Sequence, residues 1–497
     1  MTGKVWLVGA GPGDAGLLTR KGYEVLESAQ VVVYDSLVSD GILAMIPRDA
    51  VKIDAGKRAG NHHLRQEQTN QVLLEQALAG NRVVRLKGGD PFLFGRGGEE
   101  LELLREHGIP YEIVPGVTSA ISVPAYNGIP VTHRDFTSSV HIITGQKKQG
   151  QPYNIDFEAL VRTKGTLVFL MGVSALPDIC SSLMEAGMSP DMPAAILQEG
   201  TTAGQRRVIA TVATLPRRAE EEQIGTPGII VVGKVCALGE TFHWWEKLPL
   251  SGSKILVTRP RELASTMTVR LRSLGAEVVE LPAIRTEAIA DNEKLRAALR
   301  NIRDYGWIAF TSPTGVRIFF EELEKAEVDI RSLSGAKIAA IGAGTRNALK
   351  QRGIYADLVP EIYDGENLGK ALATAARKDE KILLPRAAIG NQEILDALAG
   401  FQVDDIPTYN TIPCPQDVVD IAAEVDSGKI SCAVFTSSSS VKSFAKAYPN
   451  VDFPKLTAAC IGRQTCETAK SCGMLCHTAE KATIDSLLEL VISLNKK

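Results

Sequence analysis

Short apolar runs alternate with longer amphipathic stretches along the whole chain. Residues 5–8, 31–34 and 83–86 consist mainly of valine, leucine and aromatic residues, and Arg85 interrupts the third run. Glycine-rich or polar segments follow these runs. Continuous apolar runs of about four to eight residues are typical of strands buried on both faces, and the stretches between them are long enough for helices. The pattern continues after residue 250 and predicts an α/β fold throughout.

A break in this pattern near residue 250 predicts a domain boundary. Pro249 and Gly252 interrupt any regular element, and a new strand-like run begins at Lys254. A chain of 497 residues exceeds the usual size of a single hydrophobic core. We therefore divide the chain into two halves at this point.

The second half contains an internal repeat. Three pieces recur in the same order, namely Lys254 to Arg259 with Lys381 to Arg386, Phe310-Thr311-Ser312 with Phe435-Thr436-Ser437, and Ile341-Gly342 and Thr345 with Ile461-Gly462 and Thr465. Such a repeat indicates two similar α/β lobes. A cleft between lobes is the natural place for a ligand.

Composition and charge exclude several classes of protein. The chain has 44% hydrophobic and 23% charged residues, which is typical of a folded protein, and its net charge of −3 argues against nucleic acid or an anionic membrane as the main partner. No apolar run approaches the length of a transmembrane helix. The eight cysteines are sparse, so we expect reduced thiols in a cytoplasmic protein.

The sequence predicts no metal site. His62 and His63 are adjacent and lack an evident third ligand, so we interpret them as exposed loop residues. The late cysteines lack paired C-x-x-C spacing, and Cys466 and Cys472 would face different sides of one helix.

A first glycine-rich loop, residues 9–16, follows a predicted strand and precedes a helix. This context resembles a dinucleotide-binding fingerprint, with Asp35 available to hold a ribose. Asp14, however, replaces the last glycine, and Pro12 removes a backbone amide, so both oppose pyrophosphate binding. The alternative that remains open is an NAD-dependent oxidoreductase first half followed by a non-catalytic, two-lobe ligand-binding second half.

A second glycine-rich cluster lies at residues 83–100. Five glycines and a proline follow a predicted strand, which allows the backbone to approach a ligand closely. Asp90 could accept hydrogen bonds from an amine or hydroxyl group of that ligand.

This cluster is the main feature by which residues 1–245 resemble the uroporphyrinogen-III C-methyltransferases, which are tetrapyrrole (class III) methylases. The string GGDPFLFGRGGEE at 88–100 is very specific to the group, and residues 166–172 and 199–201 also match. The resemblance implies two α/β subdomains, about 1–115 and 116–248, with S-adenosylmethionine (SAM) in the cleft between them. The implied SAM contacts are Pro12, Gly88, Gly89, Asp90, Leu93, Thr118, Ser119, Met171 and Gly200.

The resemblance also implies an acid/base pair, Asp35 and Lys57. Attack of a pyrrole carbon on the sulfonium methyl depends mainly on positioning, and a proton must then leave the tetrapyrrole. This gives Asp35 a base role, while Lys57 would donate a proton or bind a substrate carboxylate. The basic residues near the motif loops that could hold the substrate's carboxylates are Lys57, Arg58, Arg65, Arg85, Lys87, Arg96 and Arg134, none of which is assigned.

Residues 254–497 resemble the uroporphyrinogen-III synthases. The repeated pieces carry the resemblance, together with Leu384-Pro385-Arg386 and Tyr409-Asn410-Thr411. It implies two flavodoxin-like lobes, residues 253–282 with 413–497 and residues 286–408, joined by a two-strand connector. The family closes hydroxymethylbilane into uroporphyrinogen III with inversion of the last pyrrole, and it uses no cofactor.

The candidate residues of this second half lie at turns where a strand ends and a helix begins. Free backbone N–H groups and hydroxyls at such helix ends favour anions, which suits a polycarboxylate. The candidates for substrate binding are Thr311, Ser312, Thr345, Ser437 and Thr465. Tyr409, in the predicted connector, is the candidate proton donor for loss of hydroxide from the bilane.

Together, the two halves predict a bifunctional enzyme with a methyltransferase at 1–248 and a synthase at 253–497. The synthase would make uroporphyrinogen III, and the methyltransferase would methylate it twice from SAM to give precorrin-2 for sirohaem or cobalamin. The expected partners are small tetrapyrroles, and the methylase resemblance implies a homodimer through the first half.

Overall fold

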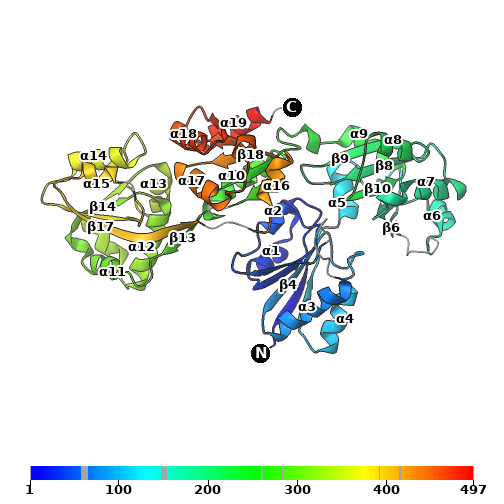
Figure 1. Ribbon diagram of the computed structural model, residues 1–497, viewed down its shortest axis with the longest axis horizontal. Helices are drawn as coiled ribbons and strands as arrows, with labels where there is room; N and C mark the ends of the chain where they lie inside the picture. Colours follow the sequence, from blue (N-terminus) through cyan, green and yellow to red (C-terminus); the bar gives the residue numbers. More distant parts are fainter. Residues whose placement is uncertain are drawn as a thin grey trace. The chain divides into compact units, whose positions relative to one another are not determined.

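The computed structural model describes residues 2–56, 65–146, 154–258, 261–281, 284–390, 392–413 and 417–495. The chain forms two compact units, Met1–Ala283 with Pro415–Lys497, and Ile284–Cys414. Within the described residues, four five-stranded sheets form the framework, three in the first unit and one in the second (Figure 1). The α/β class predicted from the sequence is confirmed.

The first sheet is fully parallel, with the order β3-β2-β4-β1-β5. Its strands are β1 (Lys4–Gly9), β2 (Val31–Tyr34), β3 (Val51–Asp54), β4 (Arg82–Lys87) and β5 (Tyr111–Val114). The helices of this part are α1 (Arg20–Glu27), α2 (Asp40–Leu43), α3 (Gln66–Leu78) and α4 (Gly97–Glu106). Val5, Leu7, Val31 and Val33 are buried on one face of this sheet, against Leu73 of α3, as expected for strands covered by helices.

The second sheet is mixed and has the order β6-β7-β10-β8-β9. Its strands are β6 (Val140–Thr144), β7 (Thr166–Leu170), β8 (Pro193–Gln198), β9 (Arg206–Thr211) and β10 (Gly228–Val232). Its helices are α5 (Ser119–Tyr126), α6 (Phe157–Thr163), α7 (Leu176–Glu185), α8 (Leu215–Glu221) and α9 (Gly239–Phe242). Only β6 and β7 are parallel, so the apolar runs that suit parallel strands occur here mostly in antiparallel pairs. Burial on both faces makes any covered strand apolar, whatever its direction.

The third sheet, also in the first unit, is parallel and has the order β12-β11-β18-β19-β20. Its strands are β11 (Lys254–Val257), β12 (Glu277–Glu280), β18 (Ile430–Phe435), β19 (Thr457–Cys460) and β20 (Leu475–Thr478). Its helices are α10 (Arg261–Ser273), α16 (Ile421–Asp426), α17 (Ser438–Ala447), α18 (Arg463–Ser471) and α19 (Ile484–Leu494). Counted along the chain, this is the 2-1-3-4-5 order of flavodoxin-like folds.

The second unit contains the fourth sheet, with the order β13-β17-β16-β14-β15. Its strands are β13 (Ile284–Ala288), β14 (Tyr305–Phe310), β15 (Lys337–Ala340), β16 (Lys381–Ala387) and β17 (Gln402–Pro413). Its helices are α11 (Glu293–Arg300), α12 (Pro313–Lys325), α13 (Ala343–Lys350), α14 (Gly365–Ala375) and α15 (Glu393–Ala397). The long strand β17 is parallel to β16 but antiparallel to β13, which forms the predicted two-strand pair at the point where the chain enters and leaves this unit.

The repeat found in the sequence occupies equivalent places in the third and fourth sheets. β18 and β14 are central, with β19 and β15 beside them on one side and β11 and β16 on the other. Ser437 and Ser312 are the N-caps of α17 and α12, and each side chain accepts a hydrogen bond from the backbone N–H three residues later. The matched pieces therefore occupy matching positions. Within the third sheet the piece that begins at Lys254 comes first along the chain, whereas within the fourth sheet its match, which begins at Lys381, comes last.

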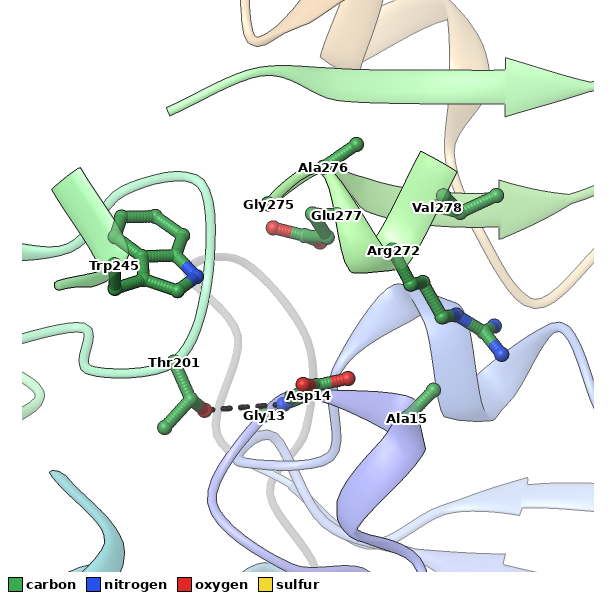
Figure 2. Close-up of a pocket in the computed structure, with 11 residues that line it drawn as sticks. Gly13, Asp14, Ala15, Thr201, Trp245, Arg272, Gly275, Ala276, Glu277 and Val278 are labelled. Atoms are coloured by element: carbon green, nitrogen blue, oxygen red, sulfur yellow. Dashed lines mark hydrogen bonds between the residues drawn. The ribbon is translucent and has the colours of Figure 1, made fainter. Parts of the chain in front are cut away.

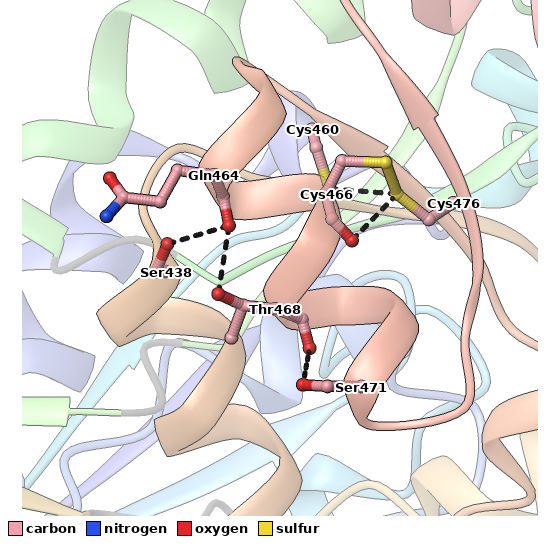
Figure 3. The surroundings of a disulfide bond; sticks show 7 residues. All are labelled: Ser438, Cys460, Gln464, Cys466, Thr468, Ser471 and Cys476. Carbon is pink, nitrogen blue, oxygen red and sulfur yellow. Dashed lines mark hydrogen bonds between the residues drawn. A yellow bond between two sulfur atoms is a disulfide. The ribbon is translucent and has the colours of Figure 1, made fainter.

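The prediction that all cysteines are reduced thiols is wrong for one pair. Cys466 of α18 and Cys476 of β20 form a disulfide, with Cα atoms 5.7 Å apart (Figure 3). The Sγ atom of Cys460 lies 4.0 Å from that of Cys476. The sequence spacing did not reveal this pair, because the turn after α18 reverses the chain and brings β20 back alongside the helix.

A membrane-spanning helix and a metal site each place requirements on the described residues. No helix among them is long and apolar enough to cross a membrane. Over the same ranges, no group of three or more histidine, cysteine, aspartate or glutamate residues is arranged to hold a metal ion.

Candidate functional site

A cavity of about 740 Å³ lies in the first unit, among loops that follow strands of the first and second sheets. Gly11 follows β1, Asp35 follows β2, and Gly88 follows β4, so three loops at the carboxyl edge of the first sheet form one wall. Met171 after β7 and Glu199 after β8 come from the second sheet. A cavity of this size suits a drug-sized or cofactor-sized ligand.

The two glycine-rich loops are joined to each other. The N–H of Gly11 donates to the carbonyl of Gly89 at 3.1 Å, and the N–H of Gly89 donates back to the carbonyl of Gly11 at 2.7 Å. A Cβ atom on Gly116 would lie 2.2 Å from the carbonyl oxygen of Gly89, so a side chain there is excluded. Gly89 itself has φ +68°, a conformation that favours glycine.

Asp90 holds this wall together through backbone groups. One carboxylate oxygen accepts hydrogen bonds from the N–H groups of Phe92 and Leu93 at 2.9 and 3.1 Å, and the other accepts from Gly116 at 3.0 Å. Asp90 lines the cavity, but these contacts already use its carboxylate. The structure therefore gives it a loop-fixing role that the sequence did not reveal.

All nine residues predicted to contact the methyl donor line this one cavity. They come from five separate stretches of sequence and are Pro12, Gly88, Gly89, Asp90, Leu93, Thr118, Ser119, Met171 and Gly200. Asp35 lines the same cavity, whereas Lys57, Arg58, His62 and His63 lie outside the described residues.

The cavity wall also concentrates unusual backbone conformations. Phe94, Arg96, Met171 and Glu199 all line it, and their φ angles are +55°, +57°, +54° and +45°. Non-glycine residues in this region carry strain and cluster at functional sites. The wall is thus built for close contact with a ligand rather than for packing alone.

The carboxylate of Asp35 is fixed by backbone donors. The N–H of Leu37 donates to it at 3.0 Å, and the N–H of Gly88 lies 3.3 Å from both of its oxygens. The side chain is 23% exposed, and a guanidinium nitrogen of Arg85 lies 3.9 Å from Oδ2. Asp35 is therefore partly open to the cavity and placed next to a positive charge.

The structure removes two residues from the group that could hold substrate carboxylates. Arg85 and Lys87 lie on β4 with side chains only 6% and 5% exposed, and both contact Glu100, which is fully buried. Burial and the neighbouring Arg85 lower the pKa of Lys87, against the opposing effect of Glu100. The alternation of Arg85 and Lys87 with apolar residues in a buried strand was the sequence signal for this cluster.

The first glycine loop has a second, much smaller pocket beside Asp14. Its volume is about 20 Å³, and Arg272 and Glu277 of the third-sheet region line it together with Thr201 (Figure 2). Asp14 accepts hydrogen bonds from Gly16 N–H and from the hydroxyl of Tyr126, both at 2.7 Å. These contacts occupy the carboxylate, and the pocket has no room for a dinucleotide.

The candidate residues of the synthase half divide between the two units. Tyr409 on β17 and Ser312 after β14 meet in the second unit, where their hydroxyl oxygens are 2.8 Å apart. Tyr409 is 6% exposed, and burial raises the pKa of its hydroxyl, while the hydrogen bond with Ser312 has the opposite effect. Ser312 is half-buried and Tyr409 is buried, so the hydroxyl of Ser312 is the more accessible of the two.

The remaining synthase candidates are partly structural. Thr345 of α13 and Thr465 of α18 are 2% and 5% exposed, so their side chains belong to the helix packing. Thr311 and Ser437 are half-buried, and the Ser437 hydroxyl also contacts that of Ser439 at 3.0 Å. Thr311, Ser312 and Tyr409 lie near the carboxyl end of β14 in the fourth sheet. Ser437 and Thr465 lie after the carboxyl ends of β18 and β19 in the third sheet.

Two family models match the chain, one in each half. Residues 4–216 match the Tetrapyrrole (Corrin/Porphyrin) Methylases, and residues 265–489 match Uroporphyrinogen-III synthase HemD. The first match contains the cavity described above, and the second contains the repeated turns.

Individual relatives resemble the chain over different lengths. It is 48% identical over 494 residues to a protein named Porphyrin biosynthesis protein HemD from Ruminiclostridium josui, covering 99% of this chain and 98% of the relative. It is 44% identical over 353 residues to the Uroporphyrinogen-III C-methyltransferase of Bacillus subtilis, covering 71% and 72% of the two chains. A crystal structure of the Thermus thermophilus uroporphyrin-III C-methyltransferase with S-adenosylhomocysteine is 39% identical over 48% of this chain and all of that one, with a TM-score of 0.42.

Proposed function

The chain belongs to the family of proteins that join a tetrapyrrole methylase to a uroporphyrinogen-III synthase, and we propose on this premise how it performs both reactions. The second half closes hydroxymethylbilane to uroporphyrinogen III, and the first half methylates that product twice from SAM to give precorrin-2. We assign residues 1–248 to the methyltransferase and 253–497 to the synthase. A nicotinamide oxidoreductase is not supported, because neither matched family is of that class.

The observation that carries the methyltransferase proposal is the single cavity. Nine residues from separate parts of the sequence line it together with Asp35, and its volume of about 740 Å³ accommodates a cofactor-sized ligand. The glycine backbones leave room for a close approach, and Leu93, Leu170 and Ile229 supply apolar contact. SAM, when bound there, supplies an electrophilic methyl group. Thr118, Ser119 and Met171 would help to hold it.

The role of Asp35 in this proposal is to accept a proton. Methyl addition to a pyrrole carbon leaves the macrocycle positively charged, and loss of a proton restores its neutral conjugation. Asp35 is ordered by Leu37 and Gly88, yet it faces the cavity. Lys57 would assist as a proton donor or a substrate ligand.

For the synthase half, we propose that Ser312 and Tyr409 act together as the acid. The two hydroxyls share a hydrogen bond of 2.8 Å, so a proton that Ser312 gives to departing hydroxide can be replaced from Tyr409. Thr311, Thr345, Ser437 and Thr465 stand at the helix ends that would bind the carboxylates of the bilane, chiefly through backbone N–H groups.

We also propose that the enzyme is a cytoplasmic homodimer and that its dimer contact lies in the methyltransferase half. The support is the likeness of that half to the tetrapyrrole methylases and the small, charged nature of the substrates. Sedimentation of the full chain measures its mass in solution and tests the dimer directly. The mass of a monomer would exclude it.

Two matched glycine variants test whether the cavity holds the methyl donor. Gly89 and Gly108 have φ angles of +68° and +66°, and a Cβ atom on either meets no atom within 4 Å, but only Gly89 lines the cavity. Gly89→Val should abolish SAM binding in calorimetry and methylation of uroporphyrinogen III, whereas Gly108→Val, with the same backbone strain, should retain both. Equal SAM affinity in the two variants would remove the cavity from the methyltransferase site.

A further inference from the structure

Three charged side chains lie buried beneath the cavity wall that contains Asp35. Arg85 and Lys87 are on β4, which is the central strand of the first sheet, and Glu100 is in the first turn of α4. Their side chains are 6%, 5% and 0% exposed. Burying charges costs several kcal/mol for each ion, so replacing such a group with apolar residues is commonly neutral or stabilising. Fold stability alone therefore gives no reason for this cluster.

Glu100 fixes both cations through one oxygen atom. Its Oε1 accepts hydrogen bonds from Arg85 Nε at 3.0 Å and from Lys87 Nζ at 2.7 Å. Gln66 donates to the same oxygen at 3.3 Å. The other oxygen, Oε2, is buried and has no hydrogen-bond partner among the described residues. The carboxylate thus uses one side to hold two positive charges in place.

The cluster points toward Asp35. Arg85 Nε donates to Glu100, and Arg85 Nη1 donates to the carbonyls of Val33 and Leu86 at 3.4 and 3.3 Å. Its Nη2 atom then lies 3.9 Å from Asp35 Oδ2. Lys87 lines the same cavity as Asp35, and Gly88, the next residue, donates to the Asp35 carboxylate. The end of β4 and the residue after it therefore place two cations, Arg85 and Lys87, and the N–H group of Gly88 on the side of the cavity where Asp35 lies.

We propose that Arg85, Lys87 and Glu100 are positioning residues that keep the Asp35 carboxylate aimed into the cavity with positive charge beside it, so that it acts as the proton acceptor of the methylation reaction. The inference rests on the proposed function and extends it, since it assigns a task to three buried charged residues. A cation next to a carboxylate favours its charged form, and only the charged form can accept a proton.

The proton step is balanced without any further reactant. After methyl addition, a C–H bond of the cationic macrocycle breaks, and its electron pair forms the carbon–carbon double bond that restores a neutral ring. The proton forms an O–H bond with Asp35. The negative charge of Asp35 is lost in this step, and water must later remove the proton. Arg85 and Lys87 remain paired with Glu100 throughout.

Three variants test the proposal through the pH dependence of methylation. Arg85→Met and Lys87→Met each remove a positive charge near Asp35, so the acidic limb of the kcat profile should move to higher pH. Glu100→Gln keeps the shape and can still accept from both cations, but it removes a negative charge, so the limb should move to lower pH. The other charged residues described around the cavity, Asp90, Arg96 and Glu199, are unchanged in all three variants.

A structural role would not produce these opposite shifts. Lys254→Met is the matched control, because Lys254 is a buried, carboxylate-paired lysine that does not line the cavity, and it should lower stability without moving the limb. If Arg85→Met or Lys87→Met fails to fold, the isosteric Glu100→Gln variant still decides the question. SAM affinity should remain within about twofold in the folded Arg85→Met and Glu100→Gln variants, because neither residue lines the cavity.

Two results would overturn the proposal, and a third concerns its premise. An acidic limb at the parental pH in all folded variants, or movement in the same direction for Glu100→Gln and Lys87→Met, would make the cluster a packing feature. If the parent enzyme does not methylate uroporphyrinogen III at all, the proposed function fails, and the role of Asp35 fails with it.

Discussion

At the scale of single residues, the fixed backbone around a side chain decides what it can do. Asp35 and Asp90 are both carboxylates that line the same cavity, yet Asp90 uses both of its oxygens to tie its own loop to the loop that contains Gly116. Asp35 has fewer backbone donors and a nearby guanidinium. Of the two carboxylates, Asp35 is therefore the one available for chemistry.

We predict that Asp35→Asn retains SAM binding but lowers the rate of methylation by about 10²–10⁴-fold, because an amide of the same shape cannot accept the proton. Calorimetry with SAM and a methylation assay on uroporphyrinogen III measure the two effects separately. Synthase activity serves as the internal control and should match that of the parent. An unimpaired methylation rate would leave Asp35 as a loop-fixing residue only.

We predict that Tyr409→Phe slows uroporphyrinogen III formation without affecting methylation of supplied uroporphyrinogen III. The variant removes the hydroxyl that is hydrogen-bonded to Ser312, and the buried ring remains in place. Bilane released from the slow variant would close spontaneously to the uninverted isomer, so the isomer ratio reports the effect. If rate and ratio equal those of the parent, binding by the helix-end turns is the better account of catalysis.

The site was predicted from sequence only in part, and the reason is physical. Motif strings identified the residues that meet at the cavity, because each string contains the glycines that close backbone contact requires. Glu100 escaped notice because a glutamate in the first turn of a helix is usually a solvated residue that favours the helix dipole. Its burial depends on β4 and α4 packing together, which no local pattern records.

At the scale of elements, the apolar pattern predicted where strands occur but not how they pair. β8 and β10 have the continuous apolar runs expected of parallel strands, yet they are antiparallel to their neighbours. The pattern measures burial on two faces, and direction depends on the connections between strands. The same limit applies to Cys466 and Cys476, whose approach depends on how β20 returns beside α18.

We predict that the double variant Cys466→Ser/Cys476→Ser has a free energy of unfolding about 2–3 kcal/mol below the parent, as expected for loss of a cross-link that closes a short loop. Urea unfolding with and without a thiol reductant measures it. The reductant should destabilise the parent and the control Cys472→Ser, which lacks a cross-linked partner, but it should not affect the double variant. A parent that is insensitive to reductant would contradict the pairing.

At the scale of the first unit, the two enzymatic halves share one hydrophobic core. Ile42 and Leu43 of α2 belong to the same buried cluster as Val279 of β12 and Val418. Lys254 of β11 adds a polar contact, because it pairs with Asp40 of α2 as well as with Glu424 at 2.5 Å and Glu277 at 3.6 Å. The boundary predicted near residue 250 therefore does not separate two independent cores.

We predict that Lys254→Met lowers the free energy of unfolding by about 3–5 kcal/mol, because it leaves buried carboxylates without their cation. Burial alone would lower the pKa of Lys254, but Glu277 and Asp40 outweigh it and raise that pKa above its usual value. The stabilisation should therefore be complete below about pH 10.5 and decline as the pH rises further.

The matched control for this variant is Lys429→Met. Lys429 pairs with the same Glu424 at 3.4 Å, but its side chain is 66% exposed, so its loss should cost no more than about 1 kcal/mol. Urea unfolding of both variants at one pH gives the comparison. Equal effects in the two variants would show that the buried contact between α2 and β11 adds nothing to stability.

The most direct measurement of the central claim, that one chain makes uroporphyrinogen III and then methylates it, supplies hydroxymethylbilane with and without SAM and identifies the products by mass and isomer type. Without SAM we predict uroporphyrinogen III as the product, and with SAM we predict its dimethylated derivative, precorrin-2. Only the uninverted isomer in the absence of SAM would contradict the synthase assignment, and an unchanged product mass in its presence would contradict the methyltransferase assignment.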